Sequence, residues 1–135
     1  MPQIEPMTDS ALETDPEVVV KEFCKLWLAG DIDAIVDAFA EDAVYHNIPM
    51  PPVTGHAEIR DFIAGFLAGF DGIDFVIHHQ VSQGGVVMNE RTDKLRRKDG
   101  VEVPLPVMGV FEVRDGKIAA WRDYFDLGTV TAAFG

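Results

Sequence analysis

Three charged side chains stand on predicted strands where apolar residues would be expected. Asn89, Arg91 and Asp93 share one face of an alternating segment, and apolar residues flank Asp123 on its own face of a later segment. Burying a carboxylate among apolar neighbours is unfavourable unless it is paired, and one guanidinium can hold two carboxylates. We therefore expect an Asp93–Arg91–Asp123 cluster inside the fold. Two acids in one dry site cannot both ionise freely, which favours one proton held between them near neutral pH, whereas Arg91 stabilises both charged forms; the sequence leaves the balance between these two effects open.

Other interpretations of these polar residues stay open at this point. Asp and Arg on strands often form solvated ladder pairs on a surface. Tyr45 and Asn47 share a face of an earlier strand, but an Asn before a proline-rich turn often only shapes that turn. We expect structural or solvated roles for the histidines, and the adjacent His78 and His79 should point to opposite faces of their strand. The sequence has no metal-ligand spacing, no serine-nucleophile motif and no nucleotide-binding fingerprint.

Helices come first along the chain and strands later. Apolar residues repeat at helical spacing from about Pro16, where either Thr14–Glu17 or Asp15 would cap the helix, and Gly30 ends it. From Ile73 onward the apolar period changes to two. The candidate helices are the one that Gly30 ends, 33–39 and one that begins near Gly55, and the candidate strands are 43–48, 73–82, 86–96, 101–113 and 118–125.

Glycine-containing turns separate the later strands, which predicts three successive hairpins. The fold class that we expect is α+β, with a curved antiparallel or mixed sheet wrapped by the N-terminal helices into a cone with an apolar pocket. We expect residues 1–15 to form a flexible acidic tail and residues 16–135 to form a single cone domain. The short pattern of 127–135 leaves open whether this segment packs over the pocket mouth.

Composition excludes several classes of partner. The 135 residues carry a formal net charge of −12, which argues against binding nucleic acid or an anionic membrane. No apolar stretch approaches the roughly 20 residues that a membrane span needs, and no secretory signal is visible. A single cysteine, Cys24, excludes an internal disulfide framework and fits a reducing compartment, so we expect a cytoplasmic protein.

Three motifs, in this order, make the sequence similar to a known family. They are Glu41–Pro49, Asn89–Asp93, and Gly109–Phe111 leading to Trp121–Asp126. From about Pro16 to Phe125 the chain resembles the limonene-1,2-epoxide hydrolase family, within the superfamily of nuclear-transport-factor-2-like and ketosteroid-isomerase-like cones. The resemblance implies an epoxide hydrolase that needs no cofactor and forms a homodimer. It also implies that a small lipophilic epoxide, terpene-like or cyclic, reacts with water to give a vicinal diol.

The resemblance further implies roles for individual residues. Asp123 would be the base that deprotonates a water, and Tyr45 and Asn47 would hold that water. Asp93 would be the acid that protonates the epoxide oxygen, and Arg91 would orient both carboxylates. The substrate-binding positions of the family fall here on Leu95, Leu105, Val107, Trp121 and Phe125.

Two other functions remain as alternatives. An isomerase, dehydratase or cyclase on a related cone would pair an Asp base with Tyr45 or Asp93 at an enolate oxygen, but this chemistry has no use for Arg91 between two acids. A non-catalytic dimer that binds a small molecule would tolerate Asp123→Asn and would show no turnover.

Overall fold

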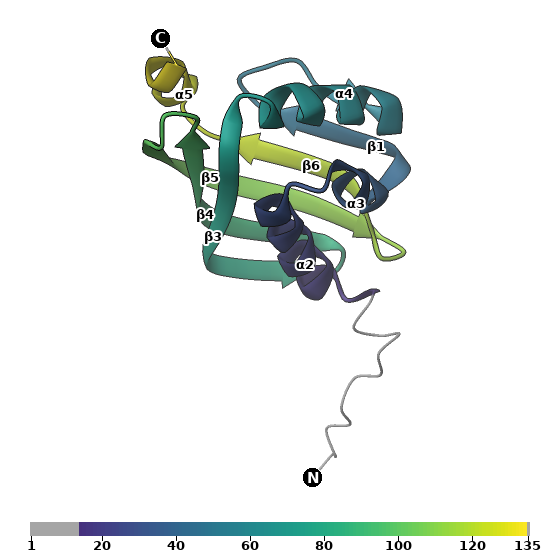
Figure 1. Cartoon of the computed structure of the whole chain (residues 1–135). Helices are drawn as coiled ribbons and strands as arrows, with labels where there is room; N and C mark the ends of the chain where they lie inside the picture. Colours follow the sequence, from purple (N-terminus) through teal and green to yellow (C-terminus); the bar gives the residue numbers. More distant parts are fainter. Residues whose placement is uncertain (1–13, 135) are drawn as a thin grey trace.

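The computed structural model describes residues 14–134, in which one mixed sheet of six strands carries the N-terminal helices on one face (Figure 1). The helices are α2 (Pro16–Ala29), α3 (Ile32–Asp37), α4 (Gly55–Leu67) and α5 (Leu127–Phe134). The strands are β1 (Phe39–Asn47), β2 (Val53–Thr54), β3 (Phe70–Gln83), β4 (Val86–Arg97), β5 (Glu102–Arg114) and β6 (Lys117–Tyr124). Residues 1–13 of the expected tail lie outside the described residues, so the domain boundary stays a prediction.

The strand order is β2-β1-β6-β5-β4-β3, which confirms the predicted α+β class. Strands β3 to β6 form an antiparallel meander, as the three turn signals predict. At the last turn both Asp115 and Gly116 have positive φ, 51° and 76°, the conformation that a tight hairpin requires. β1 then joins the far side of β6 in parallel, and this pairing makes the sheet mixed.

Helix α2 is held at both ends by local sequence signals. Asp15 is its N-cap and accepts hydrogen bonds from the backbone N–H groups of Glu17 and Val18, while Pro16 occupies the first turn. Of the two predicted caps, Asp15 is therefore the one used. Gly30 ends the helix in the left-handed conformation, with φ 69°. The capped helix presents Phe23 and Trp27 to the sheet.

Aromatic rings fill the core between α2 and the inner face of the sheet. Phe23 packs edge-on against Phe39 and Trp121, with ring centroids 5.3 and 5.1 Å apart. Trp121 in turn stacks on Phe111 at 5.2 Å. Close packing of this kind gives the strands that carry the polar cluster a rigid support.

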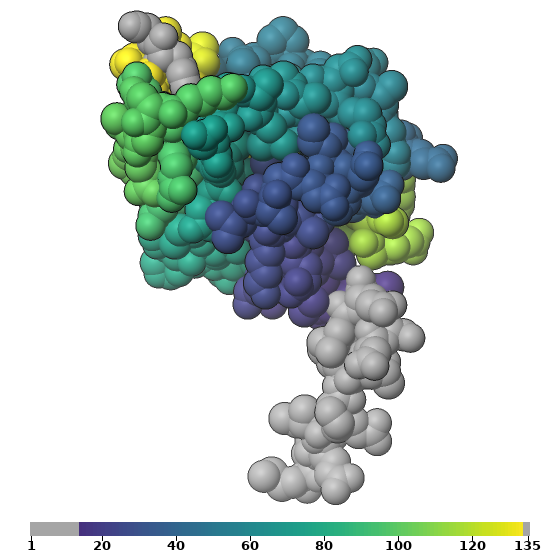
Figure 2. Space-filling view, viewed as in Figure 1, coloured from purple at the N-terminus to yellow at the C-terminus, as the bar shows by residue number. Residues whose placement is uncertain are grey.

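Helix α4 differs from its sequence pattern in one respect. Its apolar residues at helical spacing predict one fully buried face, made of Ile59, Phe62, Ile63, Phe66, Leu67 and Phe70. In the structure only Ile59 and Ile63 of the helix are buried. Phe62 and Phe66 are half-buried because they face a cavity and not the packed core. Figure 2 shows α2, α3 and α4 covering this side of the molecule, with the β4–β5 hairpin beside α5. Within residues 14–134, no helix is long and apolar enough to cross a membrane.

Candidate active site

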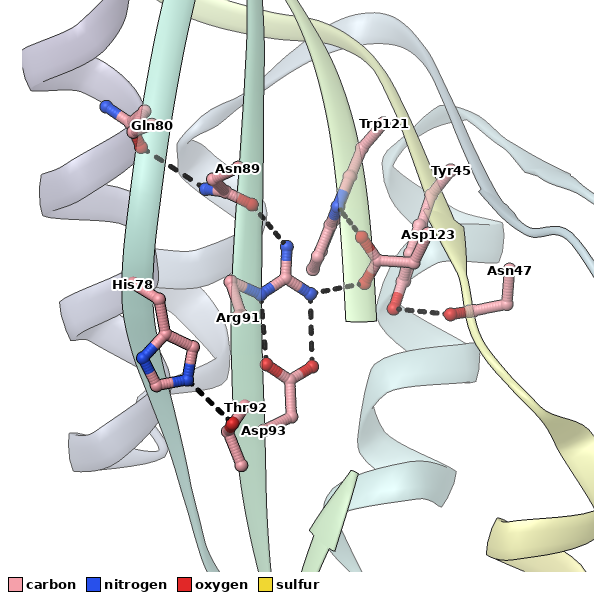
Figure 3. A network of polar contacts seen from close by, with 10 residues as sticks. All are labelled: Tyr45, Asn47, His78, Gln80, Asn89, Arg91, Thr92, Asp93, Trp121 and Asp123. Carbon is pink, nitrogen blue, oxygen red and sulfur yellow. Dashed lines mark hydrogen bonds and ion pairs between the residues drawn. The ribbon is translucent and has the colours of Figure 1, made fainter. Parts of the chain in front are cut away.

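A buried guanidinium holds two carboxylates at the centre of the sheet (Figure 3). Arg91 donates from Nε and Nη2 to the two oxygens of Asp93, at 2.9 and 3.0 Å. Its Nη2 also donates to Oδ2 of Asp123, at 2.8 Å. The exposed fractions of the three side chains are 0% for Arg91, 7% for Asp93 and 5% for Asp123. The predicted juxtaposition is therefore present, and the surface-ladder interpretation is wrong.

The pairing register of three neighbouring strands explains how residues distant in sequence meet. Asn89 of β4 lies opposite Gly109 of β5, which lies opposite Asp123 of β6. The guanidinium of Arg91 extends over the glycine in the middle of this row. A Cβ atom at position 109 would collide with Nη1 of Arg91 and would lie 2.9 Å from Oδ1 of Asp123. Gly109 thus provides the space in which Arg91 reaches across β5.

Trp121 supports the second oxygen of Asp123. Its indole Nε1 donates to Oδ1 at 2.6 Å, so both oxygens of this carboxylate accept a hydrogen bond. Trp121 is completely buried, between the rings of Phe111 and Tyr45. It was predicted as a substrate-binding residue, but the structure places it behind the cavity wall, where it orients a carboxylate.

Tyr45 and Asn47 reach the same place from β1. Because β1 pairs in parallel with β6, Asn47 lies opposite Asp123 and Tyr45 lies opposite Trp121. The Tyr45 hydroxyl donates to Oδ1 of Asn47 at 3.4 Å, and both side chains line the cavity. Their polar ends therefore face the space next to Asp123, as the resemblance implies.

The cavity measures about 450 Å³, within the usual range for small-molecule sites. Four of the predicted pocket residues line it: Leu95, Leu105, Val107 and Phe125. The other apolar lining residues were not predicted from the sequence; they are Met50, Phe62, Phe66, Phe75, Leu127 and Val130. Leu127 and Val130 belong to α5, so the C-terminal segment does lie against the cavity. Apart from Asp61, its acidic lining residues are Asp93 and Asp123.

Burial dominates the electrostatics of the two acids. Burial raises the pKa of Asp93 to about 6, although the charge and hydrogen bonds of Arg91 oppose this shift. Burial likewise raises the pKa of Asp123, against the opposing effects of Arg91 and the Trp121 hydrogen bond. Burial disfavours the charged form of Arg91, but the two carboxylates outweigh it and hold the pKa of Arg91 well above its ordinary value. The cluster is thus suited to keeping a fixed cation beside an exchangeable proton.

Among the residues that the structure describes, the other titratable side chains do not form a second polar centre of this kind. The ring nitrogens of His78 and His79 contact Thr92 Oγ1 and Glu90 Oε1, so both rings reach side chains of the outer sheet face. The prediction that they point to opposite faces is wrong, because a register shift between Ile77 and His79 interrupts the alternation of β3. Within residues 14–134, no group of three or more His, Cys, Asp or Glu side chains is placed to hold a metal ion.

Comparison with known proteins identifies the family. The family model described as limonene-1,2-epoxide hydrolase catalytic domain matches residues 14–134. The chain belongs to the limonene-1,2-epoxide hydrolase family. Epoxide hydrolase EphG of Mycobacterium tuberculosis is 33% identical to it over 123 residues, which cover 85% of this chain and 81% of that protein. As a member of this family, the chain is an epoxide hydrolase of the limonene-1,2-epoxide hydrolase type.

One solved structure agrees with the limonene-1,2-epoxide hydrolase assignment, and a second shares the fold. An LEH-like epoxide hydrolase from M. tuberculosis is 31% identical, with a TM-score of 0.74 over 94% of this chain and 90% of that one. The epoxide hydrolase/cyclase-like enzyme SalBIII, described in pyran ring formation in polyether salinomycin, is 20% identical, with a TM-score of 0.76 over 84% and 92%. The second likeness shows only that the cone fold is shared.

Proposed function

We propose that the protein adds water directly to a small lipophilic epoxide and releases a vicinal diol, without a cofactor. The observation that carries this proposal is the pair of buried carboxylates held on one guanidinium at the wall of an apolar cavity. Opening an epoxide needs a proton at the ring oxygen and loss of a proton from the attacking water. One acid and one base in the same cavity meet both requirements.

Asp123 is the proposed base. Asn47 lies opposite it in the register and Tyr45 is bonded to Asn47, so a water in the adjacent space would have three polar groups around it. Donors on both oxygens of Asp123, from Arg91 and Trp121, stabilise the ionised form that a base needs. The water proton moves to Asp123 as the oxygen bonds to an epoxide carbon.

Asp93 is the proposed acid. Its pKa of about 6 leaves a protonated population near neutral pH, and its side chain lines the cavity. As the carbon–oxygen bond breaks, the proton of Asp93 moves to the epoxide oxygen. After one turnover Asp123 carries the proton and Asp93 is ionised, so the proton must return before the next cycle. Arg91 contacts both carboxylates and stays charged throughout this exchange.

The apolar lining of the cavity favours a neutral, lipophilic substrate. Phe62, Phe66, Leu105 and Phe125 offer apolar contact, and the described lining residues include no Lys or Arg. A volume of about 450 Å³ suits a terpene-like or cyclic epoxide. A panel of terpene, cyclic meso and aliphatic epoxides, assayed for diol and its stereochemistry, tests the substrate class.

Labelled water tests the reaction type. In a single turnover in ¹⁸O-water, direct addition places the label wholly in the diol. Label that appears first in a carboxylate of the enzyme would contradict direct addition, because it would report a covalent ester. A cyclase would convert a hydroxy-epoxide to a ring without taking up label, and a binding protein would give no turnover. These outcomes separate the proposal from the alternatives that the sequence left open.

We also propose a homodimer formed through the outer face of the sheet. The exposed apolar residues Val44, Met88, Met108 and Tyr124 lie on the strands of this face, 37–47% exposed. An open sheet with an apolar outer surface is stabilised when a second copy covers it. Sedimentation measures the mass in solution, which should be that of two chains.

We propose a cytoplasmic location. The single cysteine, Cys24, is a buried free thiol, which supports this location.

Trp121→Phe should raise the pKa of Asp123, because it removes the indole N–H that stabilises the ionised carboxylate. We expect kcat/KM to fall about 10- to 100-fold at neutral pH and its acid limb to move to higher pH. The pH profile of diol formation measures this effect. An unchanged acid limb, with only a lower melting temperature, would show that Trp121 acts by packing alone.

The raised pKa of Asp93 predicts how stability varies with pH. The folded protein holds a proton up to about pH 6 that the unfolded chain, with a pKa near 4, has already released. The contribution of Asp93 to the free energy of unfolding should therefore be largest below pH 4 and should fall as the pH rises through 6. Urea unfolding of the wild type and of Asp93→Asn measures it. The stability of the variant relative to the wild type should increase over this range, and a constant difference would contradict the raised pKa.

A further inference from the structure

Arg91 makes a fourth hydrogen bond that the proposed reaction does not use. Its Nη1 donates to Oδ1 of Asn89 at 3.0 Å, on the side of the guanidinium away from Asp93 (Figure 3). Asn89 is 1% exposed and is not among the residues that line the cavity. It therefore contacts neither the substrate space nor the surface, and its partner in the site is Arg91.

Asn89 is itself held by a second amide. Its Nδ2 donates to Oε1 of Gln80 at 3.2 Å, and Nε2 of Gln80 donates to the backbone carbonyl of Glu17 at 3.1 Å. Glu17 lies in the first turn of α2, so hydrogen bonds connect the guanidinium to a capped helix end. Each amide accepts with its oxygen and donates with its nitrogen, which fixes the direction of the whole series.

A bulge in β3 places Gln80 in this series. Arg91 lies opposite Ile77, so a regular ladder would set His79 opposite Asn89. The register shifts between Ile77 and His79, and Gln80 takes that position instead. A bulge re-aims the side chains that follow it. Here it replaces an imidazole, which can become charged near neutral pH, by an amide, which accepts and donates while it stays neutral.

We propose that Asn89, tethered by Gln80 to α2, is a positioning residue that fixes the rotation of the Arg91 guanidinium within its own plane. The bidentate contact with Asp93 alone would let the pair tilt together toward or away from Asp123. The Asn89 contact holds the opposite corner, so Nη2 stays within reach of both acids. Because Asn89 is neutral, it adds no third charge to the cluster. The proposal rests on the hydrolase mechanism described above.

Two substitutions and a matched control test it. Asn89→Ala removes the contact with Arg91, and Gln80→Met cuts the tether but leaves Asn89 in place. Gln83→Met makes the same chemical change at an exposed position of β3 that is paired with Val86. We expect Asn89→Ala to lower kcat about 10- to 100-fold with KM within about twofold, because a misplaced catalytic group slows chemistry more than binding. Gln80→Met should show a smaller loss of kcat, and Gln83→Met should match the wild type.

The pH dependence separates positioning from simple packing. A displaced Arg91 stabilises both carboxylates less, so both limbs of the profile of kcat/KM should move to higher pH in Asn89→Ala. A lower melting temperature with wild-type kcat and an unmoved profile would overturn the proposal. If Asn89→Ala does not fold, Gln80→Met decides, and equality of Gln80→Met and Gln83→Met would overturn it.

A measurement without substrate keeps this inference distinct from the mechanism. Carbon-13 NMR follows the titration of the Asp93 and Asp123 carboxyl groups in the free protein. Higher pKa values in Asn89→Ala and Gln80→Met than in Gln83→Met are expected, and unchanged values would contradict the positioning role. If the wild type hydrolyses no epoxide, the proposed function fails, while this titration still tests whether Asn89 positions Arg91.

Discussion

Asp93→Asn and Asp123→Asn should each abolish measurable diol formation while the fold survives. Each variant removes one proton transfer from the proposed reaction, and such a transfer contributes roughly 10²- to 10⁴-fold to the rate. Asparagine keeps the shape of the side chain and one acceptor oxygen, so the contact with Arg91 is weakened but not lost. Gas chromatography of the diol, together with circular dichroism and thermal unfolding, measures activity and folding separately.

Asp71→Asn is the matched control for these variants. Asp71 is an exposed residue of β3, so the same change there should leave both activity and folding unaffected. Wild-type hydrolysis by either Asp93→Asn or Asp123→Asn would refute the role assigned to that carboxylate.

Gly109→Ala should also lower the rate of diol formation strongly, although it changes no polar group. The added methyl would collide with Nη1 of Arg91 and crowd Oδ1 of Asp123 and of Asn89, at 2.9 and 3.0 Å. All three are buried, and both Asn89 and Asp123 accept hydrogen bonds from Arg91, so none of them can move without breaking a hydrogen bond. We expect a loss of about 1–3 kcal/mol in the free energy of unfolding and a fall in kcat/KM of roughly 100-fold or more.

Gly72→Ala provides the control for Gly109→Ala. Gly72 also lies on a strand, but a Cβ atom there meets no heavy atom within 4 Å. Its substitution should change the free energy of unfolding by less than about 0.5 kcal/mol and leave kcat unchanged. Activity retained by Gly109→Ala would show that the close approach of Arg91 to β5 is dispensable for the reaction.

The polar cluster could be predicted because successive side chains on a strand point to opposite faces, so residues two apart share a face. A face that combines Arg91 and Asp93 with Leu95 can only be buried if the charges are paired, and this argument needs no knowledge of neighbours in space. Placing Gly109 under the guanidinium requires the register between β4 and β5. Register depends on the whole sheet and is not visible in one strand.

Three other features could not be predicted from the periodicity of the sequence. The stripe on α4 has the same spacing whether Phe62 and Phe66 pack in a core or line a cavity, because both environments are apolar. The alternation of Trp121 with Asp123 shows a shared face but not the side-chain direction that brings Nε1 onto the carboxylate. The bulge in β3 has no clear sequence signal, and it reversed the expected orientation of one histidine and placed Gln80 beside Asn89.

The parallel pairing of β1 with β6 also affects the order in which the enzyme folds. The meander of β3 to β6 is built from hairpins between consecutive strands, which close quickly, whereas β1 must find β6 across most of the chain. A folding intermediate with only the meander would already hold Arg91 beside both acids but would lack Tyr45 and Asn47. Such a species would have a native-like sheet without the two side chains proposed to hold the attacking water, so we expect diol-forming activity to appear only after β1 has paired with β6 during refolding.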